Sequence, residues 1–347
     1  MTDGPTSMPP RGHRDPLAVI AVSAAPIVLE GRYRLLVGAL IRLRRSRRGR
    51  WAAGVGYGAI AVALAALTAR HFARTSWPLS HGDPGLLVAA GLLLLLAQAL
   101  KALGWARLFR SDERPSPLGL AAGNGGAALM GLVLPGRFDD AMRIAVVRRY
   151  PGCPAGVRAL ALSLIMLGLI DSAALAPLAA IGVALPGAGF GIRVGLALVA
   201  AGGVAAAAVI VALPRLSASE RALHFRLGRW LSPRTTSLPR ASEAWALVSA
   251  CWLVRVVACF VLLGTLGVGF SFPLALLFLC AGAAGAALPI GPAGTAAQVG
   301  AGAAALIASG SGASQALAVA VSVAALGVLS GAAVFLFAVA WRIRINR

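Results

Sequence analysis

Charged side chains are concentrated in one short stretch between apolar runs, residues 134–143, which reads Leu-Pro-Gly-Arg-Phe-Asp-Asp-Ala-Met-Arg. Arg137 and Arg143 could each bind phosphate oxygens through two parallel N–H groups, because guanidinium is planar and permanently charged. Asp139 and Asp140 precede Arg143 by one helical turn, so either could hold it in place. Either could instead contact a cationic group of a ligand. The alternative is a surface salt bridge that fixes the end of a helix and contributes about 0–1 kcal/mol.

Two more charged residues lie inside long apolar runs, Asp171 in 156–183 and Arg255 in 244–267. If these runs cross a membrane, Arg255 is ~16 Å deep at 1.5 Å per residue, near the middle of a ~30 Å core. A charge at that depth costs about 2.5–3.5 kcal/mol, faces protein or a wet cavity, and has a partner. Asp171 lies at similar depth, so we predict that it pairs with Arg255. The alternative is a static structural pair.

Three other polar residues interrupt the apolar runs. Asn124 and Gln298 add uncharged amides to the candidate binding residues, although both could simply form hydrogen bonds between helices. Lys101 lies one turn before the end of its run, and we predict that its amine extends to the membrane surface.

The composition requires an integral membrane protein. Of 347 residues, 59% are hydrophobic, and the mean hydropathy is +0.83. The net charge is +21, but the Arg residues form blocks between apolar runs and are not interleaved with aromatic residues. This pattern favours membrane orientation and anionic lipid over nucleic acid. No cysteine or histidine spacing indicates a disulfide framework or a metal site, and we predict no cofactor.

The elements that must position these residues are predicted to be helices. Residues 1–50 form a basic segment that is partly disordered or lies on the membrane surface, and 51–347 form the transmembrane domain. Its halves are 51–213 and 244–340, joined by a basic loop, 214–243. Six runs are long enough to cross: 52–68, 85–105, 156–183, 194–213, 244–267 and 315–340.

Two apolar segments stop short, at Pro135-Gly136 and at Pro289, Gly291, Pro292 and Gly294. Backbone that leaves the helix at membrane depth must be buried in protein or line a wet cavity. If 118–150 returns to the side it entered from, the basic blocks 107–114, 137–158, 215–240 and 342–347 all lie in the cytoplasm. We therefore predict two re-entrant hairpins, 118–150 and 273–309. They would enter from opposite faces as an inverted repeat around a midplane site, with both termini cytoplasmic. The alternative is ordinary glycine-rich packing helices.

These residues resemble the lysylphosphatidylglycerol synthase transmembrane, or flippase-like, family over residues 55–340. The resemblance is carried by Asn124, Pro135-Gly136-Arg137, Asp140, Arg143, Arg148-Arg149, Asp171 and Leu288-Pro289 through Gly294. Three positions depart from the family pattern: Asp140 stands where Glu is usual, Gly168 where Arg often precedes the acidic residue, and Gln298 where an acidic residue is usual. The resemblance implies lipid translocation between leaflets. It does not imply synthase activity, because no soluble aminoacyl-transfer domain follows Arg347.

The resulting prediction is a multi-pass plasma-membrane lipid transporter, and not an enzyme. Its ligands would be membrane lipids that are anionic or carry a lipid phosphate. One alternative is an enzyme acting on a polyprenyl-phosphate-linked substrate, with Asp139 or Asp140 as base or metal ligand. Another is a non-transporting scaffold for an envelope-synthesis enzyme. The lipid, the direction of transport and the oligomeric state stay open.

Overall fold

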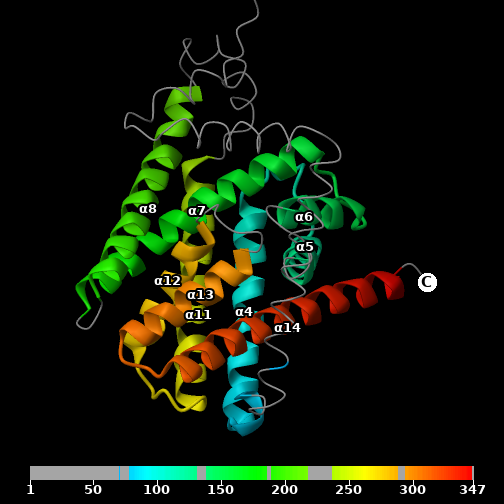
Figure 1. Ribbon diagram of the computed structural model, residues 1–347. Coiled ribbons are helices and arrows are strands. Elements are labelled where there is room, and N and C mark those ends of the chain that lie inside the picture. Colours follow the sequence, from blue (N-terminus) through cyan, green and yellow to red (C-terminus); the bar gives the residue numbers. More distant parts are fainter. Residues whose placement is uncertain are drawn as a thin grey trace, which may run out of the picture. The chain divides into compact units, whose positions relative to one another are not determined.

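The computed structural model describes residues 70, 78–130, 138–185, 189–217, 237–287 and 294–345, all within the unit Gly56–Arg347. The regular structure of these residues is entirely helical (Figure 1). A short 3-10 helix, η1, spans Pro78–His81. The α-helices are α4 Pro84–Arg107, α5 Pro117–Met130, α6 Phe138–Arg149, α7 Val157–Ala184, α8 Phe190–Ser217, α11 Leu238–Thr265, α12 Phe272–Ala287, α13 Gly294–Ala308 and α14 Ala313–Ile345.

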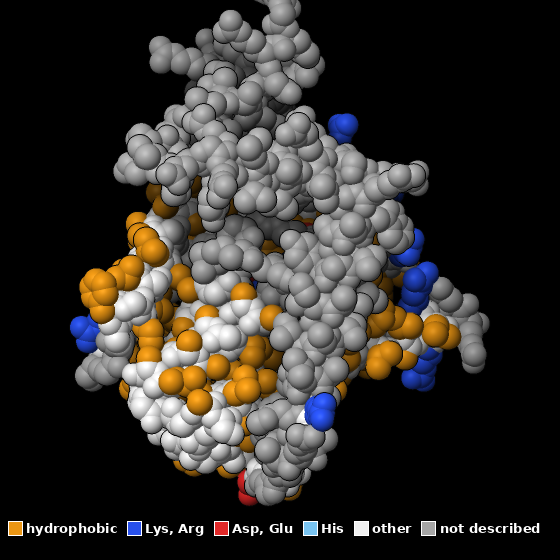
Figure 2. Space-filling view, in the orientation of Figure 1, with side chains coloured by type: hydrophobic (Ala, Val, Ile, Leu, Met, Phe, Trp, Pro, Cys, Tyr) orange, Lys and Arg blue, Asp and Glu red, His pale blue; other side chains and the backbone are white. Residues whose placement is uncertain are grey.

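Among the described residues, five helices are long and apolar enough to cross a membrane: α4, α7, α8, α11 and α14. They correspond to five of the six predicted crossing runs, and the sixth, 52–68, lies outside the described residues. Large apolar side chains are exposed on them, including Leu198 on α8 and Leu336 on α14. Figure 2 shows hydrophobic side chains spread over the visible surface of the described helices. The chain is therefore a polytopic helical membrane protein, whose apolar surface faces lipid.

Local sequence sets the helix ends. Asp83 accepts a hydrogen bond from the Leu86 amide at 3.0 Å, and Pro84 opens α4, where its missing N–H is not needed. Helix α6 has Asp139 and Asp140 in its first turn and Arg148 and Arg149 in its last, as predicted, so both charge types oppose the helix dipole.

The centre of the bundle is formed by α4, α7 and α11, which pack against one another. Trp105 of α4 is fully buried and donates its indole N–H to the Ser163 hydroxyl of α7 at 2.8 Å. A Cβ on Gly104 would lie 3.0 Å from Val248, so α4 and α11 approach closely at this point. The close approach fixes the relative rotation of the helices that carry the central charges.

Both predicted hairpin segments contain two helices packed in antiparallel order. In the first, Gly119 of α5 faces Tyr150, and Gly123 faces Val147 of α6. In the second, Gly302 of α13 faces Phe278 of α12, and Gln298 faces Gly282. In each pair the residue numbers rise along one helix as they fall along its partner. The membrane depth of these pairs, the faces from which they enter and the inverted repeat stay predictions.

Helix α14 packs against both of these helix pairs, through α13 and α5. Gly125 of α5 contacts the Gly331 carbonyl, and a Cβ on Gly331 would lie 2.8 Å from Ala128. After α6, the Tyr150 hydroxyl reaches the Ala338 carbonyl at 3.4 Å. Burial raises the pKa of this hydroxyl and nearby Arg342 lowers it, with burial the larger effect. Tyr150 therefore remains a neutral hydrogen-bond donor at physiological pH.

Candidate functional site

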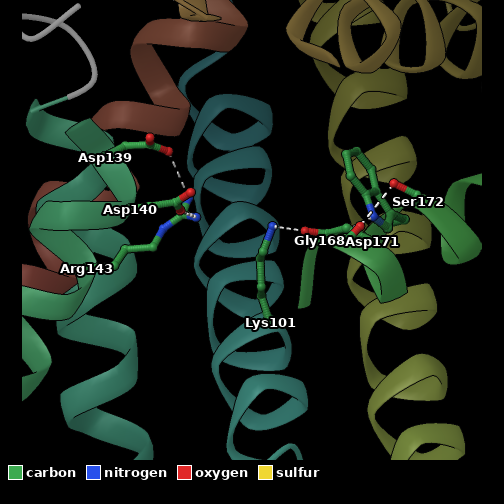
Figure 3. A network of polar contacts seen from close by, with 8 residues as sticks. Lys101, Asp139, Asp140, Arg143, Gly168, Asp171 and Ser172 are labelled. Atoms are coloured by element: carbon green, nitrogen blue, oxygen red, sulfur yellow. Dashed lines mark hydrogen bonds and ion pairs between the residues drawn. The ribbon is translucent and has the colours of Figure 1, made fainter. Parts of the chain in front are cut away.

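A charged network joins the three central helices. The Lys101 ammonium of α4 lies 2.6 Å from Asp171 Oδ2 on α7, and Trp252 of α11 donates its indole N–H to Asp171 Oδ1 at 3.1 Å. Figure 3 shows Lys101 directed at the Asp171 carboxylate. The Lys101 and Asp171 side chains are only 13% and 21% exposed. Both carboxylate oxygens thus have a partner on a different helix.

The predicted pair between Asp171 and Arg255 is wrong, and so is the prediction that Lys101 extends to the membrane surface. Lys101 is the ion-pair partner of Asp171. The Arg255 guanidinium lies over the ring of Trp252, with its carbon 5.0 Å from the ring centroid. Arg255 and Asp171 are therefore linked through Trp252. The role of Lys101 could not be predicted from hydropathy. Helix α4 is apolar on all sides, so its sequence does not indicate which face packs against α7.

The charges of this network do not cancel. Lys101 and Asp171 neutralise each other, which leaves the positive charge of Arg255. Within the described segments, no carboxylate lies within ion-pair distance of Arg255. Asp171 lies near the middle of α7, and Trp252 and Arg255 lie near the middle of α11. The network therefore carries one net positive charge at the depth predicted for the bilayer midplane.

A second charged cluster lies on α6. Arg143 Nη1 lies 2.8 Å from Asp140 Oδ1, and Nη2 lies 3.5 Å from Asp139 Oδ2. Both carboxylates therefore contact Arg143 across one helical turn, as the candidate site and the alternative of a surface salt bridge both require, and Figure 3 shows the three side chains together. Two carboxylates and one guanidinium leave one net negative charge. Because both terminal nitrogens of Arg143 face carboxylates, the cluster suits a cationic group better than a phosphate.

Asn124 of α5 is buried, with 6% of its surface exposed. Neither its amide nitrogen nor its oxygen has a hydrogen-bond partner among the described residues. The alternative prediction, a hydrogen bond to another helix, is thus not met by any described side chain. An unsatisfied buried amide costs about 1–3 kcal/mol, so this position favours a polar ligand group or water.

The remaining candidate residues are placed as follows. Gln298 of α13 is exposed, and its side-chain stem packs at Gly282 of α12. Gly294 begins α13. The other predicted residues lie outside the described segments, namely Arg137 and the hairpin turns Pro135, Gly136, Pro289, Gly291 and Pro292. Sequence reasoning missed Trp252, whose only signal was its position one turn before Arg255 on the same helix face.

Residues 51–337 match the family model described as lysylphosphatidylglycerol synthase TM region. No curated protein and no solved structure matches the chain significantly.

Proposed function

We propose, because the chain belongs to the lysylphosphatidylglycerol synthase TM region family, that it moves a phospholipid or a lipid-linked phosphate between membrane leaflets. The lipid headgroup would pass through a polar site inside the helix bundle, and the acyl chains would stay in the surrounding lipid. The plasma membrane, with both termini in the cytoplasm, is the location that the distribution of Arg residues favours.

The observation that carries this proposal is the network of Lys101, Asp171, Trp252 and Arg255 inside otherwise apolar helices. Ionisable residues at membrane depth are expensive to insert, and they mark substrate or ion pathways. A scaffold with no transport role would gain nothing from a net charge left at that depth. Asn124 supports the same function, since its buried amide has hydrogen-bonding capacity that a headgroup can use.

The charges favour a headgroup that bears both phosphate and amine. The central network has one net positive charge and suits phosphate. The cluster of Asp139, Asp140 and Arg143 has one net negative charge and suits an ammonium group. Lysylated and ethanolamine phospholipids carry both groups. Such a headgroup would meet each cluster in turn as the two helix pairs rock about the central helices.

The test uses the full chain reconstituted in vesicles that contain fluorescent phosphatidylethanolamine or phosphatidylglycerol. A quencher added outside the vesicles measures how fast the inner-leaflet label becomes accessible. We expect faster exchange than in protein-free vesicles, with chemically unchanged lipid by mass spectrometry. If leaflet exchange is no faster than in protein-free vesicles for every lipid tested, the proposal is wrong. Conversion of a polyprenyl-phosphate donor would favour the membrane enzyme instead.

Replacing Arg143 with Ala should slow this exchange severalfold, because Asp139 and Asp140 lose the guanidinium that holds both carboxylates in position for an ammonium group. The substitution removes the cation that separates two neighbouring carboxylates. Arg193→Ala is the matched control, because Arg193 is an exposed arginine near the start of α8. Equal exchange rates for the two variants, at equal insertion, would remove Arg143 from the proposed pathway.

A further inference from the structure

We infer that Arg255 is the phosphate-binding residue of the central site, and that Trp252, Asp171 and Lys101 hold it in position with its charge uncompensated. This inference rests on the proposed function and names the group that contacts the lipid. The ligand class is a phosphodiester with one negative charge, as in a phospholipid headgroup.

The first step concerns charge. Asp171 accepts from the N–H edge of the Trp252 indole, and Arg255 lies over the face of the same ring, so Asp171 is the carboxylate that the contacts link to this guanidinium. Lys101 forms an ion pair with Asp171 at 2.6 Å, and this pair prevents Asp171 from serving as the counter-ion of Arg255. A purely structural network would need only one cation for one carboxylate. The second cation makes the site electropositive, and a singly charged phosphodiester would bring it to neutrality.

The second step concerns geometry. The hydrogen bond from the Trp252 indole to Asp171, at 3.1 Å, fixes the rotation of the ring. That ring carries the guanidinium on its face. A cation–π contact acts through the ring quadrupole and does not require the N–H fork to bond an acceptor. The guanidinium N–H groups of Arg255 therefore stay available to donate to two phosphate oxygens, while the Trp252 ring fixes the position of the guanidinium.

The third step concerns the connection between helices. Lys101 belongs to α4, Asp171 to α7 and Trp252 to α11, so the contacts run through all three central helices. Relative movement of α7 against α11 would break the indole hydrogen bond and release the ring that supports Arg255. Phosphate binding and the packing of the central helices are thereby coupled, and Trp252 is the positioning residue that couples them.

The experiment measures binding of short-chain phosphatidylglycerol to the full-length protein in detergent, by isothermal titration calorimetry at two salt concentrations. Short-chain diacylglycerol is the uncharged control ligand, and Arg193→Gln is the control variant. We expect Arg255→Gln to weaken phosphatidylglycerol binding at least tenfold and to remove its salt dependence. Arg255→Lys should keep the salt dependence but bind more weakly, because an ammonium group lacks the planar fork. Unchanged binding by Arg255→Gln would overturn the inference.

Three further variants separate charge from position. Trp252→Phe keeps the ring and loses the indole N–H, so it should weaken binding severalfold while the salt dependence stays that of the wild type. Lys101→Met should weaken binding as much as Arg255→Gln, because the negative charge of Asp171 then offsets the positive charge of Arg255 without forming a direct ion pair with it. Adding Asp171→Leu to Lys101→Met should restore binding to within a few-fold of wild type, since the site regains its single positive charge. Equal binding by Lys101→Met and this double variant would contradict the charge argument, and wild-type binding by Trp252→Phe would contradict the positioning role.

The outcomes distinguish this inference from the proposed function. If binding depends on Arg255 but vesicles show no leaflet exchange, the site stands and transport fails. If leaflet exchange is fast and insensitive to Arg255→Gln, transport stands and the assignment of Arg255 fails. Size-exclusion elution and the thermal unfolding midpoint of each variant establish that it is folded.

Discussion

Replacing Lys101 with Met is expected to lower the free energy of unfolding by about 3–5 kcal/mol, one of the two largest effects that the structure implies. The substitution leaves the Asp171 carboxylate partly buried among α4, α7 and α11 with no cation of the described residues within ion-pair distance. The Trp252 indole supplies only one hydrogen bond to that carboxylate. Unfolding in mixed micelles with increasing denaturing detergent, followed by circular dichroism, measures the difference.

Two comparisons make this result interpretable. Arg107 and Glu243 form an ion pair at 3.1 Å in which both side chains are about half exposed, so Arg107→Ala should change stability by less than about 1 kcal/mol. The double variant Lys101→Met and Asp171→Leu should return close to wild-type stability, because apolar residues of similar volume often replace a buried pair without loss. A Lys101→Met effect as small as that of Arg107→Ala would mean that the pair is not desolvated.

Replacing Gly125 with Ala is the second substitution with a large expected effect. The new Cβ would overlap the Gly331 carbonyl and lie 3.1 Å from the Phe335 amide nitrogen, so it meets backbone and not a movable side chain. Helices α5 and α14 must then separate. We expect a loss of about 1–3 kcal/mol, as for other overpacked interiors, together with slower lipid exchange.

Gly327→Ala is the matched control for Gly125→Ala. Gly327 lies on α14, one turn before Gly331, and a Cβ there meets nothing within 4 Å. Alanine at this position should leave stability unchanged or raise it by about 0.5–1 kcal/mol, since glycine is the poorer helix former. The same detergent unfolding measurement applies. If both alanine variants behave alike, the contact between the two glycines does not limit how closely α5 and α14 pack.

Features that depend on local sequence could be predicted. The long apolar runs predicted α4, α7, α8, α11 and α14, and the charges of residues 139–149 predicted the ends of α6 and allowed the contacts of Arg143 with carboxylates. These features require only composition and helical spacing. The antiparallel packing within the pairs α5–α6 and α12–α13 also follows from the short connections between the helices of each pair.

Features that depend on which face of an apolar helix is buried could not be predicted. The similar membrane depth of Asp171 and Arg255 favoured an ion pair between them. The rotation of α4 about its axis instead brings Lys101 to the Asp171 carboxylate. The role of Trp252 depends on the rotation of α7 and α11 about their axes. Without that information, a Trp in an apolar run is interpreted as a core residue. The contact between Gly125 and Gly331 joins residues far apart in the chain, and no spacing rule within one helix indicates it.

Helix α14 is longer than the hydrocarbon core of a bilayer is thick. Its 33 residues extend about 50 Å at 1.5 Å per residue, well beyond a hydrocarbon core of about 30 Å. The excess must be taken up by inclination or by protrusion of the end that carries Arg342 and Arg344. Because α14 touches both helix pairs, a membrane of longer or shorter acyl chains is expected to change the inclination of α14 and, with it, the position of both pairs.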